Sequence, residues 1–192
     1  VFKKGINLSN IKSNYKVNQF DMLFYIKSLF QLMKPRVMSL VLFTSMVGLL
    51  IAPEKVSFAV SIMSLFAVAL GAGAAGALNM WYESDLDALM TRTCLRPIPT
   101  GKVQKSQALW FGTILSLISI SLLYVTANLV SSILLATTIG FYFFIYTIWL
   151  KRRTSQNIVI GGAAGALPPV IGWAIATNSI SIESIILFLI IF

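Results

Sequence analysis

Three oxygen-bearing side chains, Asn79, Glu83 and Asp87, recur at intervals of four residues at the end of an apolar run. In an α-helix each step of four drifts by only about 40°, so these three share one face and Asp85 points elsewhere. Oxygen ligands suit a hard cation such as Mg²⁺, which one or two carboxylates and substrate phosphates typically hold. The spacing indicates a magnesium site, with Asp85 a weaker candidate ligand; a solvated helix end that only anchors the helix fits it equally well.

Basic residues near this acidic face are candidates for binding a phosphate. Arg92, Arg96 and Lys102 follow in the same stretch and could meet one directly. The run Lys151-Arg152-Arg153 closes a later apolar segment, where it could grip a diphosphate or serve as an ordinary interfacial anchor. The run Lys34-Pro35-Arg36 is also ambiguous, because proline suits the start of a helix.

The composition is that of an integral membrane protein. The 192 residues are 57% hydrophobic and 11% charged, with a mean hydropathy of +0.85, outside the ordinary soluble range. The net charge of +9 comes from clustered basic residues, and no nucleic-acid partner is expected. The chain has no histidine, which excludes a histidine base, haem ligand or metal ligand in this segment. Its single cysteine, Cys94, can form no intrachain disulfide.

The apolar segments predict about five complete transmembrane helices and a truncated sixth. The expected spans are 37–53, 57–79, 107–127, 129–150 and 158–177, with a further one from about 184. A tight turn near Asn128 should make the third and fourth an antiparallel hairpin. Because the last apolar run is too short to cross a bilayer and the first residue is not methionine, we expect the chain to be part of a longer protein.

Residues 1–36 form a basic N-terminal segment before a predicted transmembrane domain over 37–192. Residues 20–30 predict an amphipathic helix at the membrane surface; an organellar targeting segment would favour arginine over the lysines present. If the spans alternate, 14 of the 15 basic residues fall on one side and only Lys55 on the other. The positive-inside rule then places the N-terminus and the acidic face on the cytoplasmic side of a bacterial inner membrane, or on the matrix side in a mitochondrion.

Three further patterns have two interpretations each. Residues 71–76 match GxGxxG, but within an apolar span this favours close helix packing over dinucleotide binding, and 161–166 has the same meaning. Pro168-Pro169 either kinks the fifth span or lines a site, since such breaks need protein or a water-filled cavity to cover the freed carbonyls. Aromatic residues could stabilise a carbocation or form an interfacial belt: Trp81, Tyr82, Tyr142, Phe143, Phe144 and Trp149.

Three segments in this order resemble the intramembrane aromatic prenyltransferases, most of all the members that modify haem. They are 32–40; 79–87 with 90–93 and 96–101; and 146–154 with 157–166 and 168–173. The resemblance implies a nine-helix bundle that transfers a farnesyl group from farnesyl diphosphate to a vinyl carbon of haem B. Haem O and diphosphate would be the products and Mg²⁺ the cofactor. The enzyme would serve haem A synthesis for cytochrome oxidase, with a transient contact to haem A synthase as a further expectation.

The resemblance also implies roles for individual residues. Asn79, Glu83 and Asp87 would be the catalytic residues that bind magnesium and diphosphate. The other diphosphate partners would be Arg92, Lys102, Tyr146, Lys151 and Arg152. The chain departs from the family at Glu83, where aspartate is commoner, and the family's second acidic motif would lie beyond Phe192. We therefore expect the 192 residues alone to be inactive.

Three other functions remain open at this stage. The same chemistry could act on a quinone or chlorin precursor. The chain could instead belong to a transporter or channel that uses the acidic face as an ion site. It could also be a non-catalytic membrane subunit, in which neutralising Glu83 and Asp87 would change only stability.

Overall fold

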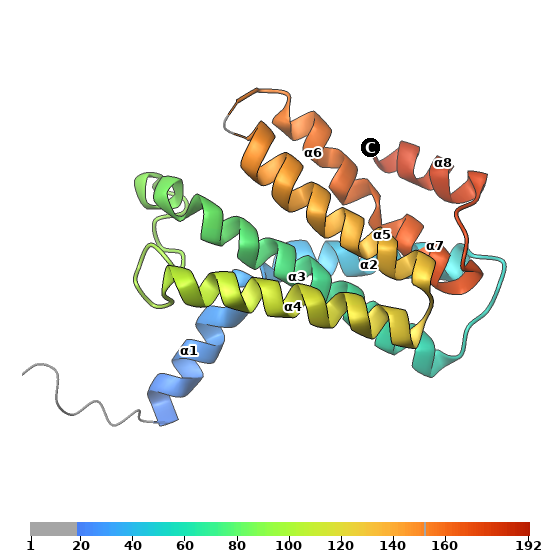
Figure 1. Ribbon diagram of the computed structural model, residues 1–192, viewed down its shortest axis with the longest axis horizontal. Helices are drawn as coiled ribbons and strands as arrows, with labels where there is room; N and C mark the ends of the chain where they lie inside the picture. The colour runs from blue at the N-terminus through green and yellow to red at the C-terminus, as the bar shows by residue number, and fades with distance from the viewer. Residues whose placement is uncertain (1–18, 152) are drawn as a thin grey trace, which may run out of the picture.

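The computed structural model describes residues 19–151 and 153–192, and every regular element within these ranges is helical (Figure 1). The elements are α1 (Gln19–Leu32), α2 (Pro35–Ile51), α3 (Phe58–Leu89), α4 (Lys105–Thr126), α5 (Leu129–Gly140), η2 (Phe141–Leu150), α6 (Asn157–Ala166), α7 (Pro168–Thr177) and α8 (Ile182–Ile191). The segment η2 is a π-helix that continues α5 directly. The predicted all-α class is confirmed.

Within the described residues, four helical stretches are long and apolar enough to cross a membrane: Phe58–Leu89, Lys105–Thr126, Leu129–Leu150 and Asn157–Thr177. A fifth is a bent pair formed by α1 and α2, which meet at 53°. Lys34 joins this pair in the left-handed conformation, with φ of 53°, which residues other than glycine seldom adopt. The polytopic membrane architecture is therefore confirmed, with four spans or five if the bent pair is one.

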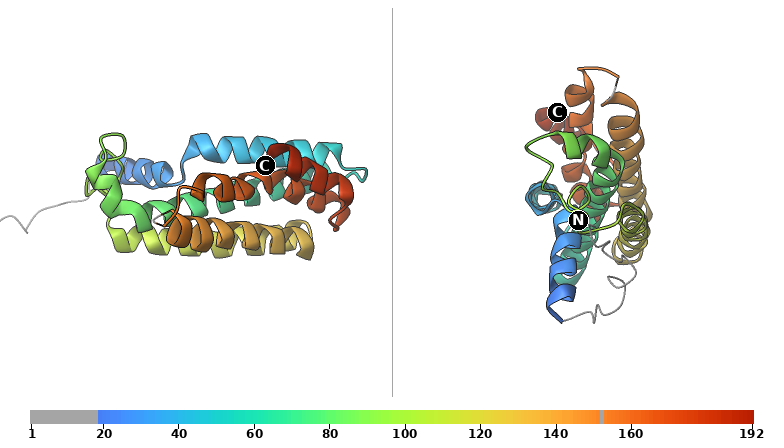
Figure 2. Two further views of the ribbon diagram at one scale, coloured as in Figure 1. Left: turned by 90° about the horizontal axis from the view of Figure 1, so that it is seen from above. Right: turned by 90° about the vertical axis from the view of Figure 1, so that its left-hand side faces the viewer.

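Helix α3 is the centre of the bundle, with α4 packed along it and α2 on another side (Figures 1 and 2). Its glycine-rich segment allows the close approach that the sequence predicts. A Cβ atom on Gly71 would lie 2.8 Å from a methyl carbon of Leu135, and one on Gly76 would lie 3.2 Å from backbone oxygens of the chain entering α2. The GxGxxG pattern is thus a packing surface inside a helix.

Helices α2 and α7 approach each other more closely still. A Cβ atom on Gly172 would lie 1.9 Å from the backbone oxygen of Ser45, and one on Gly48 would lie 2.1 Å from that of Pro169. The predicted break of the fifth span is present, because α6 ends at Ala166 and α7 begins at Pro168. This break lets α7 lie directly against α2.

The predicted hairpin between α4 and α5 is confirmed. Asn128 occupies the turn, where its side-chain oxygen accepts a hydrogen bond from the Ser131 backbone N–H at 2.9 Å. Its amide nitrogen donates to the backbone oxygen of Ala174 at 2.8 Å. The turn is therefore also tied to the end of α7.

The opposite end of the bundle holds most of the polar chemistry. A small apolar cluster there, Leu32, Ala77, Met80, Val103 and Ala108, joins α1, α3, the 90–104 loop and α4. Helix α1 forms as expected over 20–30, and its exposed face is largely apolar. The remaining basic N-terminal residues, 1–18, lie outside the described residues.

Candidate active site

The predicted acidic face lies on the last turns of α3, where the helix runs beyond its most apolar part. Asn79, Glu83 and Asp87 are 1%, 4% and 4% exposed, whereas Asp85 is exposed. The structure therefore buries the three residues that the four-residue spacing placed together and turns Asp85 away from them. Buried carboxylates are unfavourable unless they are paired or coordinated, so their partners matter.

Three basic residues from three different segments meet this face. Lys34, at the junction of α1 and α2, donates through Nζ to the side-chain oxygen of Asn79. Lys151, directly after η2, brings Nζ to 2.5 Å from Glu83 Oε1. Glu83 Oε1 is therefore buried against a cation.

The third basic residue is Arg96, in the loop that follows α3. Its Nη1 donates to both carboxylate oxygens of Asp87, at 2.8 Å and 2.7 Å. Thr93 Oγ1 also donates to the backbone oxygen of Asp87 at 3.0 Å. The loop is thereby folded back over the end of the helix.

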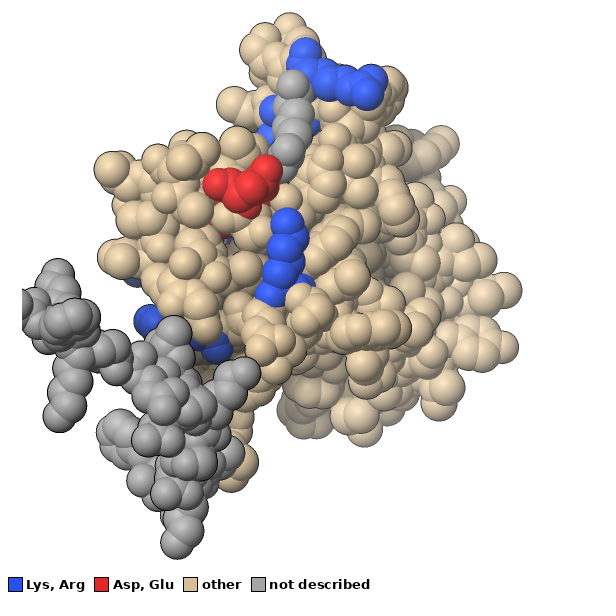
Figure 3. All heavy atoms as spheres, turned by 60° about the vertical axis from the view of Figure 1, so that its left-hand side comes forward, with Lys and Arg blue, Asp and Glu red and all other residues tan. Residues whose placement is uncertain are grey.

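Lys34 and Arg96 bring two positive charges to the same acidic face, with Lys34 beside Asn79 and Arg96 beside Asp87. An anion bound between these two cations would favour their charged forms. The site is therefore suited to a ligand with several negative charges. Figure 3 shows this end of the molecule, where exposed acidic atoms lie close to basic side chains on the surface.

Helix η2 supplies the wall opposite α3. Thr147, which is fully buried, accepts a hydrogen bond from the side-chain amide of Asn79 at 3.1 Å. Tyr142 and Tyr146 stack with ring centroids 5.1 Å apart, and Lys151 Nζ lies 5.8 Å from the centre of the Tyr146 ring. Tyr146 is thus beside the predicted diphosphate site, next to the cation that pairs with Glu83.

Arg92 and Lys102, two other predicted diphosphate partners, are exposed rather than buried in this cluster. Lys102 lies over the Phe24 ring of α1, 5.2 Å from its centre. Arg152 lies outside the described residues. Roles for these three residues stay predictions.

The aromatic residues divide into two groups. Trp81 contacts Phe143 across the α3–η2 interface, with ring centroids 6.1 Å apart, so this pair helps to pack the two helices that carry the site. Phe144 and Trp149 are mostly exposed, as an interfacial belt requires. The exposure of Phe144 and Trp149 fits the belt interpretation, and a carbocation role for the other aromatic residues stays a prediction.

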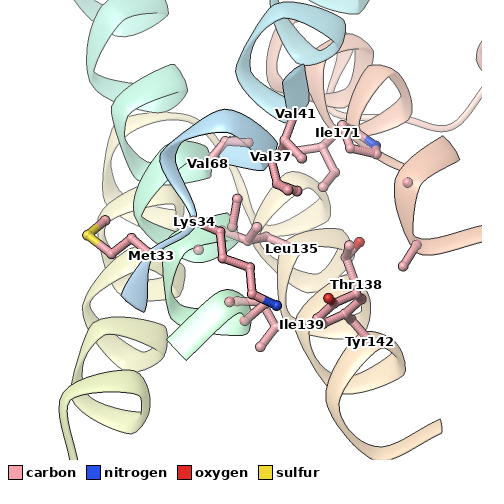
Figure 4. Close-up of a pocket in the computed structure, with 17 residues that line it drawn as sticks. Met33, Lys34, Val37, Val41, Val68, Leu135, Thr138, Ile139, Tyr142 and Ile171 are labelled. Atoms are coloured by element: carbon pink, nitrogen blue, oxygen red, sulfur yellow. The ribbon is translucent and has the colours of Figure 1, made fainter. Parts of the chain in front are cut away.

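An apolar cavity of about 110 Å³ begins beside the charged cluster (Figure 4). Lys34 and Tyr142 lie at its polar end, and Thr138 lies beside Tyr142. The remaining lining is almost wholly hydrocarbon from α2, α3, α5 and α7, and includes Val68, Leu135, Ile139, Pro168 and Ile171. Pro168, which the sequence offered as a kink or a lining residue, is both.

The donor set fits a hard cation that also binds a phosphate. Across the described ranges, no three His, Cys, Asp or Glu side chains lie close enough to hold a metal on their own. The face offers two carboxylates and one amide oxygen, and all three side chains are buried. Mg²⁺ commonly takes its other ligands from water and substrate phosphates, so this incomplete oxygen set is suited to it.

Sequence reasoning gave too little weight to two residues and missed a third. Lys34 was left ambiguous between a phosphate-binding residue and part of a helix start, and Arg96 was one of several basic residues that could meet a phosphate. Thr147 was not singled out at all. These contacts are hard to predict because the partners are far apart in the sequence. The Lys34-Pro35 pair directly before a span was nevertheless a signal that could have pointed to Lys34.

The fold and site define a polytopic helical membrane protein with a charged, oxygen-rich site at one end of an apolar cavity. The chain belongs to the UbiA prenyltransferase family, whose model matches residues 41–192. This confirms the family resemblance seen in the sequence. No solved structure matches the chain significantly.

Within this family, the chain is similar to several curated proteins that share one name. A protein named protoheme IX farnesyltransferase from Pelagibacter ubique (strain HTCC1062) is 66% identical over 179 residues, 93% of this chain and 59% of the relative. One of the same name from Ehrlichia ruminantium (strain Welgevonden) is 57% identical, over 87% of this chain and 57% of the relative. Protoheme IX farnesyltransferase 2 of Mesorhizobium japonicum (strain LMG 29417 / CECT 9101 / MAFF 303099) is 59% identical, over 85% and 52%. The chain spans about half the length of the curated relatives it matches.

Proposed function

We propose that the full-length protein containing this chain transfers a farnesyl group from farnesyl diphosphate to a vinyl group of haem B, giving haem O and diphosphate. The structural observation that carries this proposal is a buried carboxylate–amide face, surrounded by three cations, at the mouth of an apolar cavity. The names of the relatives, at 57% to 66% identity, support the choice of farnesyl group and haem.

The diphosphate would bind at the cluster around α3. Lys34, Arg96 and Lys151 lie on three sides of the acidic face and can donate charged hydrogen bonds to phosphate oxygens. Asn79, Glu83 and Asp87 would hold Mg²⁺, which would neutralise charge on the leaving diphosphate. The same contacts stabilise the charge that builds up as the bond to the farnesyl carbon breaks.

The farnesyl chain would occupy the apolar cavity. Its mouth lies beside Lys34 and Tyr142, and its walls are hydrocarbon, so a chain entering from the diphosphate site meets no polar group deeper than Thr138 in the lining. Exclusion of water protects an allylic cation from premature hydrolysis. The face of Tyr142, which lines the mouth, can stabilise such a cation.

The proposed reaction breaks the C1–O bond of farnesyl diphosphate, and the electron pair leaves with diphosphate. The vinyl group of haem then forms a new bond to C1. Water adds to the remaining vinyl carbon and loses a proton, for which the released diphosphate is an acceptor. The product is heavier than haem B by a farnesyl group and a hydroxyl group.

We place the protein in a bacterial inner membrane, with the charged end of the bundle facing the cytoplasm. Lys34, Arg96, Lys102 and Lys151 all lie at the α1 end of the bundle, whereas Lys55 follows α2 at the other end (Figure 1). The positive-inside rule supports this orientation. The relatives come from bacteria, which supports a bacterial inner membrane over a mitochondrial one.

The experiment that tests the function asks which acceptor receives the farnesyl group. Membranes containing the full-length protein receive farnesyl diphosphate and Mg²⁺ together with haem B, a quinone precursor or a chlorin precursor. Farnesylation of haem B alone supports the proposal. Farnesylation of a quinone or chlorin precursor instead would show that haem B is not the acceptor. Ion flux without diphosphate release would indicate a transporter.

A further inference from the structure

A short relay of hydrogen bonds links α3 to the backbone of η2. Thr147 Oγ1 donates to the backbone oxygen of Tyr142 at 2.9 Å. The same oxygen accepts from Nδ2 of Asn79 at 3.1 Å. Thr147 and Asn79 are 0% and 1% exposed, so water does not compete for either bond.

The direction of this relay fixes the orientation of the Asn79 amide. A backbone carbonyl can only accept, so the single hydroxyl hydrogen of Thr147 is committed to Tyr142. Only lone pairs of Thr147 remain for Asn79, which must therefore present its NH₂ group to them. Its oxygen then faces the opposite way, toward Lys34 Nζ.

The π-helical winding of η2 makes the relay possible. A threonine in an α-helix bonds the carbonyl three or four residues back, whereas Thr147 bonds the carbonyl five residues back. In an α-helix, Thr147 would also lie about 140° around the axis from Tyr142. The five-residue turn, seen again in the bond from Lys151 N to Tyr146 O at 3.1 Å, returns Thr147 and Lys151 to the side that faces α3.

We propose that Thr147 is a positioning residue for the metal site: it holds the Asn79 amide so that the oxygen, and not the nitrogen, is turned toward Lys34 and the charged cluster, where it would be available to a cation. A hard cation takes oxygen ligands, so a flipped amide would present a donor group where a ligand is needed. The relay is thus a hydrogen-bonded support for a metal ligand. Loss of such a support typically lowers metal affinity by about 10- to 100-fold. This inference rests on the metal–diphosphate site of the proposed function.

The test is a binding measurement on the purified full-length protein in detergent. Mn²⁺, which shares the oxygen ligands of Mg²⁺, is titrated in the presence of inorganic diphosphate and followed by electron paramagnetic resonance. Thr147→Val removes the hydroxyl at similar volume, and Thr147→Ser keeps it. Thr44→Val is the matched control, because Thr44 Oγ1 bonds only Leu40 and Val41 carbonyls of its own helix.

The expected result is an Mn²⁺ affinity lower by about 10- to 100-fold in Thr147→Val, with Thr147→Ser and Thr44→Val close to wild type. Equal affinities in Thr147→Val and wild type would overturn the inference, and so would equal losses in the Val and Ser variants. If Thr147→Val does not fold, Thr147→Ala removes the same hydroxyl without a new methyl contact. Failure of both to fold would make Thr147 structural and overturn the positioning role.

A double variant tests whether Thr147 acts through the orientation of the Asn79 amide. Asn79→Asp has two equivalent oxygens and no NH₂ group, so no orientation remains for Thr147 to fix. Adding Thr147→Val to Asn79→Asp should therefore change Mn²⁺ affinity by less than about twofold, the non-additivity expected of directly coupled residues. A full 10-fold further loss would contradict the inference. Absence of Mn²⁺ binding in the wild type would instead overturn the proposed metal site itself.

Discussion

Arg96 holds Asp87 through one guanidinium nitrogen, Nη1, which lies 2.8 Å and 2.7 Å from the two carboxylate oxygens. The guanidinium has five N–H donors, so a contact through Nη1 alone leaves others in position to meet a phosphate. The loop after α3 therefore both covers the acidic face and carries a cation to it. This arrangement explains why a span ends in a run of charged residues.

Replacing Arg96 should be more damaging than replacing Arg92. We expect Arg96→Gln to lower kcat/KM for farnesyl diphosphate by about 100-fold or more, because it removes a charge from a buried carboxylate and from the proposed diphosphate site. Arg92 is exposed, and Arg92→Gln should cost less than about tenfold by the same reasoning. Steady-state kinetics on membranes that contain the full-length variants measure both values. A larger loss of kcat/KM in Arg92→Gln than in Arg96→Gln would contradict the proposed diphosphate site.

Neutralising Asp87 should abolish turnover without preventing membrane insertion. Asp87→Asn keeps the shape of the side chain but removes a metal-binding charge and the partner of Arg96. We expect at least about a 100-fold loss of turnover, the scale of losing one electrostatic contact to the transition state. Asp85→Asn, two residues away and exposed, is the control. Near-normal turnover in Asp87→Asn would remove its proposed role.

Lys34 should matter more for substrate binding than Lys102. Lys34 is next to Asn79 at the cavity mouth, whereas Lys102 lies over Phe24. Lys34→Met should raise KM for farnesyl diphosphate by about tenfold or more, as expected for loss of one charged hydrogen bond. Lys102→Met should raise it less. The reverse order would contradict the proposed site and show that the diphosphate binds nearer Lys102 than Lys34.

Two glycine substitutions should have opposite effects on stability. Gly172→Ala would place a Cβ atom 1.9 Å from the Ser45 backbone oxygen, so α2 and α7 must separate, at a cost of about 1–3 kcal/mol or more. Gly140 has helical dihedral angles and open space around its missing Cβ. Gly140→Ala should therefore be neutral or stabilising by up to about 1 kcal/mol. Thermal unfolding in detergent checks the pair, and equal melting temperatures would contradict this packing.

The sequence predicted those features that depend on local periodicity. The face shared by Asn79, Glu83 and Asp87 follows from helical spacing, and the turn at Asn128 and the break at Pro168 follow from the residues themselves. Each of these is present in the structure.

The sequence did not predict features that depend on contacts between distant segments. Lys34 meets Asn79 across 45 residues and Thr147 meets Asn79 across 68, and neither pairing has a local pattern. The π-helical turn was also missed, because apolar composition does not distinguish a five-residue turn from an α-helical one. That turn decides which side of the helix carries Thr147 and Lys151.

The most direct test of the whole account uses membranes that contain the full-length protein, supplied with haem B, farnesyl diphosphate and Mg²⁺. The extracted pigments are analysed by mass spectrometry. The account predicts a haem heavier by a farnesyl and a hydroxyl group, formed together with diphosphate and lost when Mg²⁺ is chelated. Unchanged haem in the presence of all three components would contradict it.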